Sequence, residues 1–416
     1  MVLKKQGHYL DRSLGYAMSR KVLQRFGVQI YTKGLEKLPS GSTNRRVLLL
    51  PNHRSYLDPV LVHHVLGCSG YRQPRVVALD FLATTPLAPM FRKCGAVFIK
   101  GSFADLEYRE KMNETLTRFA DEGDWVSFYL EGMRSLSGKQ IDPRHGLLAG
   151  LMAERSCVIY PINISYTRLI EDREFVSKRR GFNMKQTAIS LLLPSQGTGA
   201  VYFTIGDPIY TEPNDHPRDK AMSVTRSIMK DNFIHTTDIL ATILLHNQEF
   251  VTIDHLRNEV QWLTEVLQHR GVSCTPLNLP YALSLLKHCV SVREGNVKIT
   301  NKSVVLYYRN RMLYTIGDLI SLPSVLRKEV LWSPSRKPRM RDSKRVCEIA
   351  RHAFEPTIFL YKYLTEKLQE GERSVKQLRL SIEDNPSCCY ETVTNFLNVL
   401  KENKAVLVEG DVITVL

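Results

Sequence analysis

The chain has 416 residues, of which 43% are hydrophobic and 24% are charged. At roughly 100–200 residues per domain this length predicts two to three domains, and such fractions exclude disordered, collagen-like and disulfide-scaffold proteins. Lys and Arg number 57 against 42 Asp and Glu, which leaves a net charge of +15 at pH 7. A cationic surface favours phosphate-bearing ligands, nucleic acid or an anionic lipid surface as partners.

Residues 1–33 are predicted to form a basic amphipathic helix. An apolar row repeats every four positions: Leu10, Leu14, Met18, Val22 and Phe26. Two interpretations stay open, a helix packed on the protein body and a helix lying on an anionic membrane surface. The longest apolar runs of the chain fall far short of about 18 residues, so no transmembrane helix is expected.

Residues 34–230 are predicted to form an α/β domain, because short apolar runs alternate with helical stretches. The expected strands are Arg46–Leu50, Arg75–Leu79, Ala96–Ile99, Trp125–Leu130, Val158–Ser165 and Ala200–Ile205. The expected helices between them span 58–67, 104–122 and 146–156. This alternation favours a mixed, mostly parallel sheet covered by helices, in which loops at one shared edge gather the catalytic groups.

Residues 231–416 are predicted to form a mostly helical domain, beginning with helices Thr236–Asn247 and Ile253–Arg270. Residues 327–345 are strongly basic, which fits either a solvated linker or a patch that faces phosphates or lipid. The eight cysteines show no Cys-x-x-Cys pair, so we expect free thiols, a reducing compartment and no metal site.

The end of the chain resembles a winged-helix unit. A predicted helix, Glu391–Glu402, precedes a hairpin made of Val406–Val408 and Val412–Val415. Such a unit combined with a positive net charge raises nucleic-acid binding as one function. The helix carries both acidic and amide side chains and lacks a basic face, so nucleic acid is not the partner we expect.

The first candidate site is Asn-His-Arg-Ser-Tyr-Leu-Asp, directly after the first strand of the α/β domain. Its histidine, His53, has the side chain whose pKa near 6.5 suits the removal of a proton from a hydroxyl at neutral pH. Asp58 orients that imidazole only if the first helical turn folds the carboxylate back. Ser55 and Asp58 also match a helix capping box, and the spacing alone leaves both interpretations open.

The second candidate site is Glu-Gly-Met-Arg-Ser, at the end of another predicted strand. Gly132 lets the backbone approach a ligand closely, and the planar, permanently charged guanidinium of Arg134 suits a phosphate. Glu131 supplies an acceptor beside it, and Ser135 ends the motif. A salt-bridged strand exit fits these residues equally well.

Two more predicted strands contribute single residues of interest. Lys100 follows the predicted strand Ala96–Ile99 and places a cation there, directly before a turn of small residues. Pro161 interrupts an otherwise apolar strand, and proline donates no hydrogen bond to a neighbouring strand. We therefore expect Pro161 at a sheet edge, at a bulge or in the wall of a pocket.

The order of these motifs resembles the four sequence blocks of the glycerolipid acyltransferases. The blocks read His-x4-Asp, Gly-x-x-Phe-Ile-Lys, Glu-Gly-x-Arg-Ser and Pro-Ile-x-Ile-Ser-Tyr. The similarity is greatest to the branch that contains glycerol-3-phosphate and dihydroxyacetone phosphate acyltransferases. Weaker similarities at 203–208, 236–270 and 307–310 extend it over most of the chain.

The resemblance implies an α/β acyltransferase that uses acyl-CoA as co-substrate and needs no metal or other cofactor. It implies that His53 is the general base for the glycerol-backbone hydroxyl and that Asp58 orients it. The implied substrate-binding residues are Lys100, Glu131, Gly132, Arg134, Ser135 and Pro161, with Arg134 and Lys100 as contacts of the acceptor phosphate. The net charge agrees with two anionic substrates.

The chain departs from the family pattern at two positions, because Gly101 and Leu136 stand where the family usually has arginine. These differences leave open a catalytically impaired paralogue that binds lipid or acyl-CoA. Dihydroxyacetone phosphate is slightly favoured over glycerol-3-phosphate as acceptor. We expect an intracellular protein, peripheral on a mitochondrial, endoplasmic reticulum or peroxisomal membrane, with the membrane surface as a partner.

Overall fold

The computed structural model describes eight stretches of the chain: residues 2–41, 43–79, 88–100, 106–175, 199–247, 250–317, 344–382 and 390–416. The chain divides into two compact units. The first unit contains Met1–Arg134, Pro143–Tyr166 and Ala188–Asn232, and the second contains Ser135–Asp142, Thr167–Thr187 and Phe233–Leu416. The division after Asn232 lies close to the predicted boundary at 230, but two short internal segments of the predicted α/β domain belong to the second unit.

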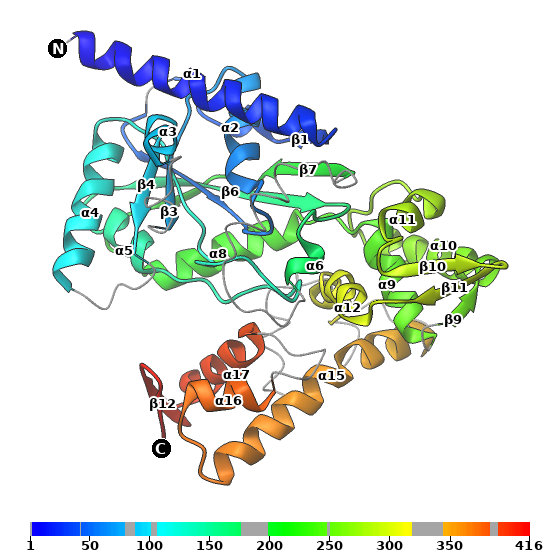
Figure 1. The fold of residues 1–416 in the computed structure, drawn as a ribbon. Coiled ribbons are helices and arrows are strands. Elements are labelled where there is room, and N and C mark those ends of the chain that lie inside the picture. Colours follow the sequence, from blue (N-terminus) through cyan, green and yellow to red (C-terminus); the bar gives the residue numbers. More distant parts are fainter. Residues whose placement is uncertain are drawn as a thin grey trace. The chain divides into compact units, whose positions relative to one another are not determined.

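The first unit is built around an eight-stranded mixed sheet (Figure 1). Its strands are β1 (Gln29–Lys33), β2 (Arg46–Pro51), β3 (Arg75–Leu79), β4 (Ala96–Ile99), β5 (Val126–Ser127), β6 (Cys157–Tyr166), β7 (Ala200–Ile205) and β8 (Ile209–Thr211). The order across the sheet is β1-β7-β6-β2-β5-β3-β4, and β8 pairs with β6. β6 runs antiparallel to β7 and β8, whereas the other pairs are parallel, which confirms the predicted fold class.

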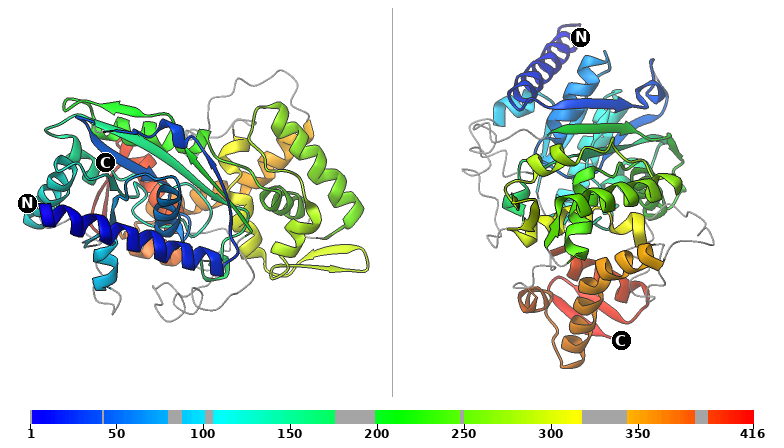
Figure 2. Two further views of the ribbon diagram at one scale, coloured as in Figure 1. Left: turned by 90° about the horizontal axis from the view of Figure 1, so that it is seen from above. Right: turned by 90° about the vertical axis from the view of Figure 1, so that its right-hand side faces the viewer.

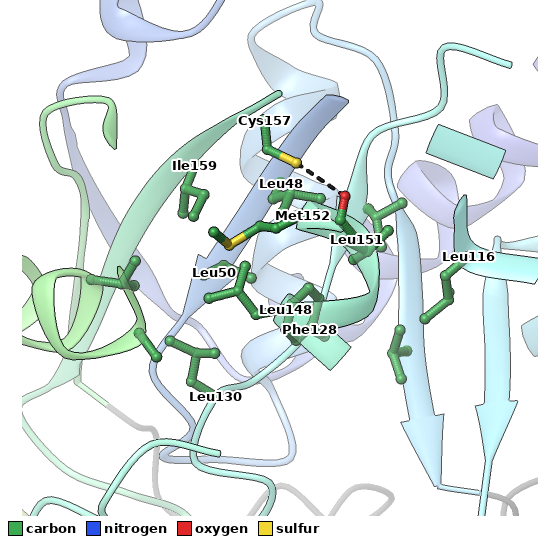
Figure 3. Packing of buried hydrophobic residues seen from close by; sticks show 14 of the residues in the cluster. Leu48, Leu50, Leu116, Phe128, Leu130, Leu148, Leu151, Met152, Cys157 and Ile159 are labelled. Carbon is green, nitrogen blue, oxygen red and sulfur yellow. Dashed lines mark hydrogen bonds between the residues drawn. The ribbon is translucent and has the colours of Figure 1, made fainter. Parts of the chain in front are cut away.

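Helices cover both faces of this sheet because its central strands are apolar on both sides. The helices are α1 (Val2–Arg25), α2 (Asp58–Cys68), α3 (Ala88–Lys93), α4 (Leu106–Asp121), α5 (Gly146–Met152) and α8 (Pro217–Lys230). Leu48 and Leu50 pack with Leu116, Leu148 and Met152 in one buried cluster (Figure 3). α1 and α8 lie on opposite sides of the sheet in Figure 1.

The N-terminal helix differs from its prediction in two ways. It ends at Arg25, and residues Gln29–Lys33 form strand β1, which pairs with β7. The positive φ of 56° at Gly27 lies between the two elements, in a conformation that glycine adopts readily. Helix α1, dark blue in Figures 1 and 2, contacts α2 and α3.

The buried face of α1 is also displaced from the predicted apolar row. Ser19 and Leu23 are buried, whereas Leu14 is 41% exposed. Gly15 is buried on the same face, where a Cβ would be in ordinary van der Waals contact, 3.4 Å from the Cβ of Cys94. An apolar row does not reveal packing through glycine and serine, so the buried face lies beside the predicted row, of which Met18 and Val22 are half-buried. Phe26 is fully buried, just beyond the end of α1.

The second unit is mostly helical, as predicted. Its helices are α6 (Asp172–Phe175), α9 (Thr236–His246), α10 (Ile253–His269), α11 (Leu279–Leu285), α12 (Lys302–Asn310), α13 (Leu313–Ile316), α15 (Lys344–Gln369), α16 (Val375–Ser381) and α17 (Tyr390–Glu402). Helix α9 is buried from Thr236 to Leu245 and packs against α10, α11, α12 and α15. A small sheet that the prediction did not contain joins β9 (Phe250–Thr252), β10 (Val290–Arg293) and β11 (Asn296–Ile299).

The predicted C-terminal helix and hairpin are confirmed as α17, β12 (Val406–Glu409) and β13 (Val412–Val415). The Ser374 hydroxyl accepts from the amide of Gln377 at the start of α16 and lies 2.6 Å from Asp411 Oδ2, next to the hairpin. Most of the predicted basic patch at 327–345 lies outside the described residues. Among the helices that the structure describes, none is both long and apolar enough to cross a bilayer.

Candidate active site

The His53 loop begins where β2 leaves the sheet. Beyond the end of β2, the side chain of Asn52 continues the hydrogen bonding to β6. Its Oδ1 accepts from the amide of Ile164 at 2.8 Å, and its Nδ2 donates to the carbonyl of the same residue at 3.1 Å. Asn52 is buried, so these two bonds satisfy an otherwise costly amide. They fix the position from which His53 projects.

His53 and Asp58 lie in direct contact. The Nδ1 atom of His53 is 2.9 Å from Oδ2 of Asp58, the first residue of α2. The same oxygen accepts from the amides of Arg54 at 2.6 Å and Ser55 at 2.9 Å. The first helical turn therefore folds the carboxylate back onto the loop, which is the arrangement that a general base requires.

The capping interpretation is satisfied in part by the same carboxylate. Asp58 accepts from the Ser55 amide as in a capping box, but the Ser55 hydroxyl accepts from the amide of Leu57 at 3.1 Å. Helix α2 itself begins after Leu57 without a side-chain cap, so only the Asp58 half of a capping box is present. Neither interpretation excludes the other.

The protonation of His53 follows from its contacts. Because an ionised carboxylate only accepts hydrogen bonds, Nδ1 carries the proton and Nε2 is the basic nitrogen. Burial lowers the pKa of His53 below 6.5, the contact with Asp58 opposes that effect, and the charges of Arg134 and Arg54 lower the pKa further. The imidazole is therefore neutral at pH 7. Its side chain is 19% exposed, which leaves part of the ring accessible.

Tyr129 forms a platform for the imidazole. The two rings stack with centroids 4.0 Å apart and an interplanar angle of 17°. Tyr129 follows β5, the strand beside β2 in the sheet. The stack therefore limits rotation of the His53 ring, and Asp58 determines which nitrogen faces inward.

Glu131 connects the second motif to the His53 loop. Its Oε1 accepts from the amide of His53 at 3.2 Å, and its Oε2 accepts from the Arg54 guanidinium at 2.9 Å. Both side chains of this ion pair are largely buried. The next residue, Gly132, has a φ of 68°, and a Cβ there would lie 2.9 Å from Cδ of Arg144. The positive φ restricts this position to glycine, whereas the Arg144 side chain could move to make room for a Cβ.

Arg134 contacts Tyr56, an aromatic residue of the His53 loop. Its guanidinium carbon is 3.3 Å from the ring centroid of Tyr56, a cation–π contact. Its positive charge is also one of the two that lower the pKa of His53. The structure therefore brings His53, Asp58, Glu131 and Arg134 together in the first unit.

Two predicted residues have their described contacts with other groups. Ser135 belongs to the second unit, where its buried hydroxyl donates to the carbonyl of Lys139 at 2.6 Å. Lys100 is exposed, and its ammonium lies 4.6 Å from the ring centroid of Tyr108. Lys100 follows β4, three strands from β2, which at about 4.8 Å per strand is roughly 14 Å across the sheet.

Pro161 lies inside the sheet, where β6 changes partners. Residues up to Ile159 pair with β8, and residues from Ile162 pair with β7. Gly206 donates to the carbonyl of Pro161 at 2.8 Å from the turn between those two strands. Of the three predicted places, a sheet edge is therefore excluded, while a bulge and a pocket wall stay open. A proline is tolerated here because no neighbouring strand accepts from this position.

Sequence reasoning missed four residues of the site. Asn52 and Arg54 lie within the first motif, and their positions next to His53 in the sequence could have identified them. Tyr129 could have been found in the same way, beside Glu131. Tyr166 ends the fourth motif, but nothing in that motif indicates the hydrogen bond of 2.5 Å that its hydroxyl donates to Oδ1 of Asp58, 108 positions earlier.

Parts of this chain are similar in sequence to known proteins. Residues 29–165 match the family model described as Acyltransferase. Dihydroxyacetone phosphate acyltransferases are 25% identical over 337 residues in Oryctolagus cuniculus and 26% identical over 315 residues in Mus musculus. These alignments cover 71% and 65% of this chain but 50% and 46% of the relatives.

Two bacterial proteins complete the comparison. A glycerol-3-phosphate acyltransferase of Glaesserella parasuis is 24% identical over 370 residues, which cover 77% of this chain and 45% of the relative. The crystal structure of the 1-acyl-sn-glycerophosphate acyltransferase PlsC of Thermotoga maritima aligns with a TM-score of 0.37 and 16% identity, over 53% of this chain and 78% of that one. The chain spans about half the length of the curated relatives it matches. Residues 29–165 thus carry the Acyltransferase domain, and the sequence is similar to glycerol-3-phosphate and dihydroxyacetone phosphate acyltransferases.

Proposed function

We propose that this protein transfers a fatty acyl group from acyl-CoA to the sn-1 hydroxyl of dihydroxyacetone phosphate or glycerol-3-phosphate. One observation carries the proposal: a neutral imidazole, with Nδ1 held 2.9 Å from Asp58, lies near the charges of Arg54 and Arg134. A base beside two cations suits a substrate that carries both a hydroxyl and a phosphate.

The proposed reaction follows from the basic Nε2 of His53. This nitrogen removes the proton of the acceptor hydroxyl while the oxygen attacks the thioester carbonyl. The new C–O bond forms, the C–S bond breaks, and the imidazolium returns the proton to the departing thiolate of coenzyme A. Asp58 stabilises the imidazolium by accepting from Nδ1, and Tyr129 keeps the ring plane in place.

In this proposal the anionic groups of the substrates meet cationic side chains. Arg134 contacts the acceptor phosphate, and Gly132 leaves room for the substrate beside it. Glu131 acts through the His53 loop, which it holds from the amide of His53 and the side chain of Arg54. Lys100 remains a proposed phosphate contact, and Ser135 and Pro161 remain proposed contributors to the pocket.

The membrane surface is the proposed location of the reaction. Helix α1 exposes Leu14, and the exposed Lys21 and Arg25 lie on the same side of the helix, which suits an anionic lipid surface. Flotation with vesicles containing anionic lipid tests this. Binding should weaken when Lys21 and Arg25 are replaced by glutamate, and unchanged flotation of that variant would exclude α1 as the contact.

The deciding experiment is an assay of the purified protein with a labelled acyl-CoA and each acceptor in turn. We expect acyl-dihydroxyacetone phosphate, lysophosphatidate or both as products. The relative rates with the two acceptors identify the preferred one. If neither product forms while labelled acyl-CoA still binds, the protein is instead a lipid-binding paralogue. The replacement of the family arginines by Gly101 and Leu136 would then account for the lost turnover.

A further inference from the structure

The longest strand of the first unit reaches beyond its neighbour. β6 pairs with β2 from Cys157 to Ile162, opposite Pro51, and then continues to Tyr166. The side chain of Asn52 extends the pairing to Ile164. This overhang carries the ring of Tyr166 to the start of α2, where its hydroxyl reaches Asp58.

We propose that Tyr166 is a positioning residue of the acyl transfer, which orients the Asp58 carboxylate and limits the negative charge that it presents to His53. This inference rests on the proposed function. Tyr166 does not reach the reacting atoms itself in this proposal. It acts through a hydrogen bond of 2.5 Å to Oδ1, the oxygen that does not face the imidazole.

The surroundings of Asp58 support this role. Its side chain has no exposed surface, and its two oxygens accept from four donors. Three donors meet Oδ2: His53 Nδ1 and the amides of Arg54 and Ser55. Tyr166 is the donor to Oδ1 that the described residues show. Because these donors lie on both oxygens, the carboxylate has one favoured rotation.

The hydrogen bond also has an electrostatic consequence for the base. A donor on Oδ1 draws charge away from Oδ2, so Asp58 stabilises the imidazolium of His53 less strongly than an otherwise bare carboxylate would. The other charged and titratable groups around the imidazole are Arg54 on its own loop, together with Tyr129, Glu131 and Arg134 after β5. None of these contacts Oδ1 through an interaction shown for the described residues, so removal of the Tyr166 hydroxyl isolates its contribution.

The first test measures the imidazole without any substrate. His53 is followed by NMR in protein labelled at histidine, with His53→Ala identifying its signal. In Tyr166→Phe the midpoint of the His53 titration should rise by roughly half a pH unit, because the carboxylate regains charge. An unchanged midpoint would reject the proposal whether or not the protein turns over acyl-CoA, so this result is separate from the fate of the proposed function.

The second test uses turnover. Loss of the orienting bond should lower kcat by about tenfold with little change in the KM of either substrate, since the substrates do not touch Tyr166. The acid limb of the kcat profile should move to higher pH with the NMR midpoint. Tyr160→Phe is the matched control, because Tyr160 is a buried tyrosine of the same strand outside the site.

A third variant covers the case in which Tyr166→Phe fails to fold. Incorporation of 3-fluorotyrosine at position 166 keeps the ring and the hydroxyl but makes the phenol a stronger donor. The His53 midpoint should then fall, opposite to the shift in the phenylalanine variant. A rise, or no movement, would contradict the charge-limiting role of Tyr166.

Discussion

Each of the two units contains a buried aspartate beside a histidine and a tyrosine. In the first unit His53 Nδ1 lies 2.9 Å from Asp58, and in the second His288 Nε2 lies 2.9 Å from Asp172. Tyr166 donates to Asp58 at 2.5 Å and Tyr308 donates to Asp172 at 2.7 Å. The same three residue types therefore form both clusters.

Exposure separates the two clusters. The His53 side chain is 19% exposed, whereas that of His288 is 2% exposed. Asp172 also has Arg168 3.6 Å away, so its charge is balanced within the unit by a cation. A His–Asp pair is thus a candidate for catalysis only where the second ring nitrogen reaches a substrate, and the cluster around Asp172 serves stability instead.

The largest expected effect distinguishes the two histidines. His53→Ala should lower kcat by roughly 10²–10⁴, the usual contribution of a general base. His288→Gln should lower the stability of the protein and leave kcat per folded molecule close to wild type. Initial rates measured against active protein, with circular dichroism to check folding, compare the two. Equal loss of kcat in both variants would remove the distinction between the clusters.

The next effect concerns the stability of the second cluster. Asp172→Asn should lower the free energy of unfolding at pH 7 by about 3–5 kcal/mol, because it leaves a buried cluster unbalanced. Burial raises the pKa of Asp172, but His288, Arg168 and Tyr308 outweigh it and hold the pKa below the ordinary 3.8. The stabilisation is therefore complete above pH 3.8 and is lost as the pH falls through the lower folded-state value.

The measurement for Asp172 is urea unfolding at several pH values. The gap between wild type and Asp172→Asn should be widest near neutral pH and should narrow below about pH 4, as the native carboxylate takes up a proton. A gap that stays constant down to pH 2 would mean that the charge of Asp172 is not what stabilises the unit.

A smaller effect is expected at the phosphate contact. Arg134→Ala should raise the KM of the acceptor by roughly 10–100-fold with a lesser change in kcat, because a charge-assisted contact is lost. Arg155→Ala removes the same charge from a half-exposed arginine that pairs with Asp121, and serves as the control. If both variants raise KM equally, the effect comes from net charge and Arg134 does not contact the phosphate.

The smallest effect is expected at the hydroxyl of Tyr129. This oxygen is buried and has no hydrogen-bond partner among the described residues, and burial followed by the charge of Asp58 raises its pKa well above 10. Tyr129→Phe keeps the stack and should change stability by less than about 1 kcal/mol, in the stabilising direction if at all. Tyr129→Leu, which removes the stack, should lower kcat. Thermal unfolding and initial rates test both, and a large loss in Tyr129→Phe would show that the hydroxyl has an unseen partner.

Much of the first unit was predictable because its signals are local. Apolar runs predicted β3, β4 and β7 at their observed bounds. The expected strand at Trp125–Leu130 is shorter in the structure, where β5 covers Val126–Ser127, because the chain turns away to form the loop of Tyr129 and Glu131. Strand β1 was missed, since its residues are mostly exposed and follow a helix without an apolar signal.

The sequence by itself indicated the similarity to acyltransferases and the α/β class, because both depend on neighbouring residues or on the order of motifs along the chain. It left the contact between His53 and Asp58 open, and the structure shows that contact. Only the tertiary structure decided that Glu131 holds the His53 loop, that Ser135 belongs to another unit and that Tyr166 meets Asp58. Those relations depend on strand order and on how far β6 extends past β2. Residues that lie far apart in the chain meet only when the sheet has formed, and no local pattern records that meeting.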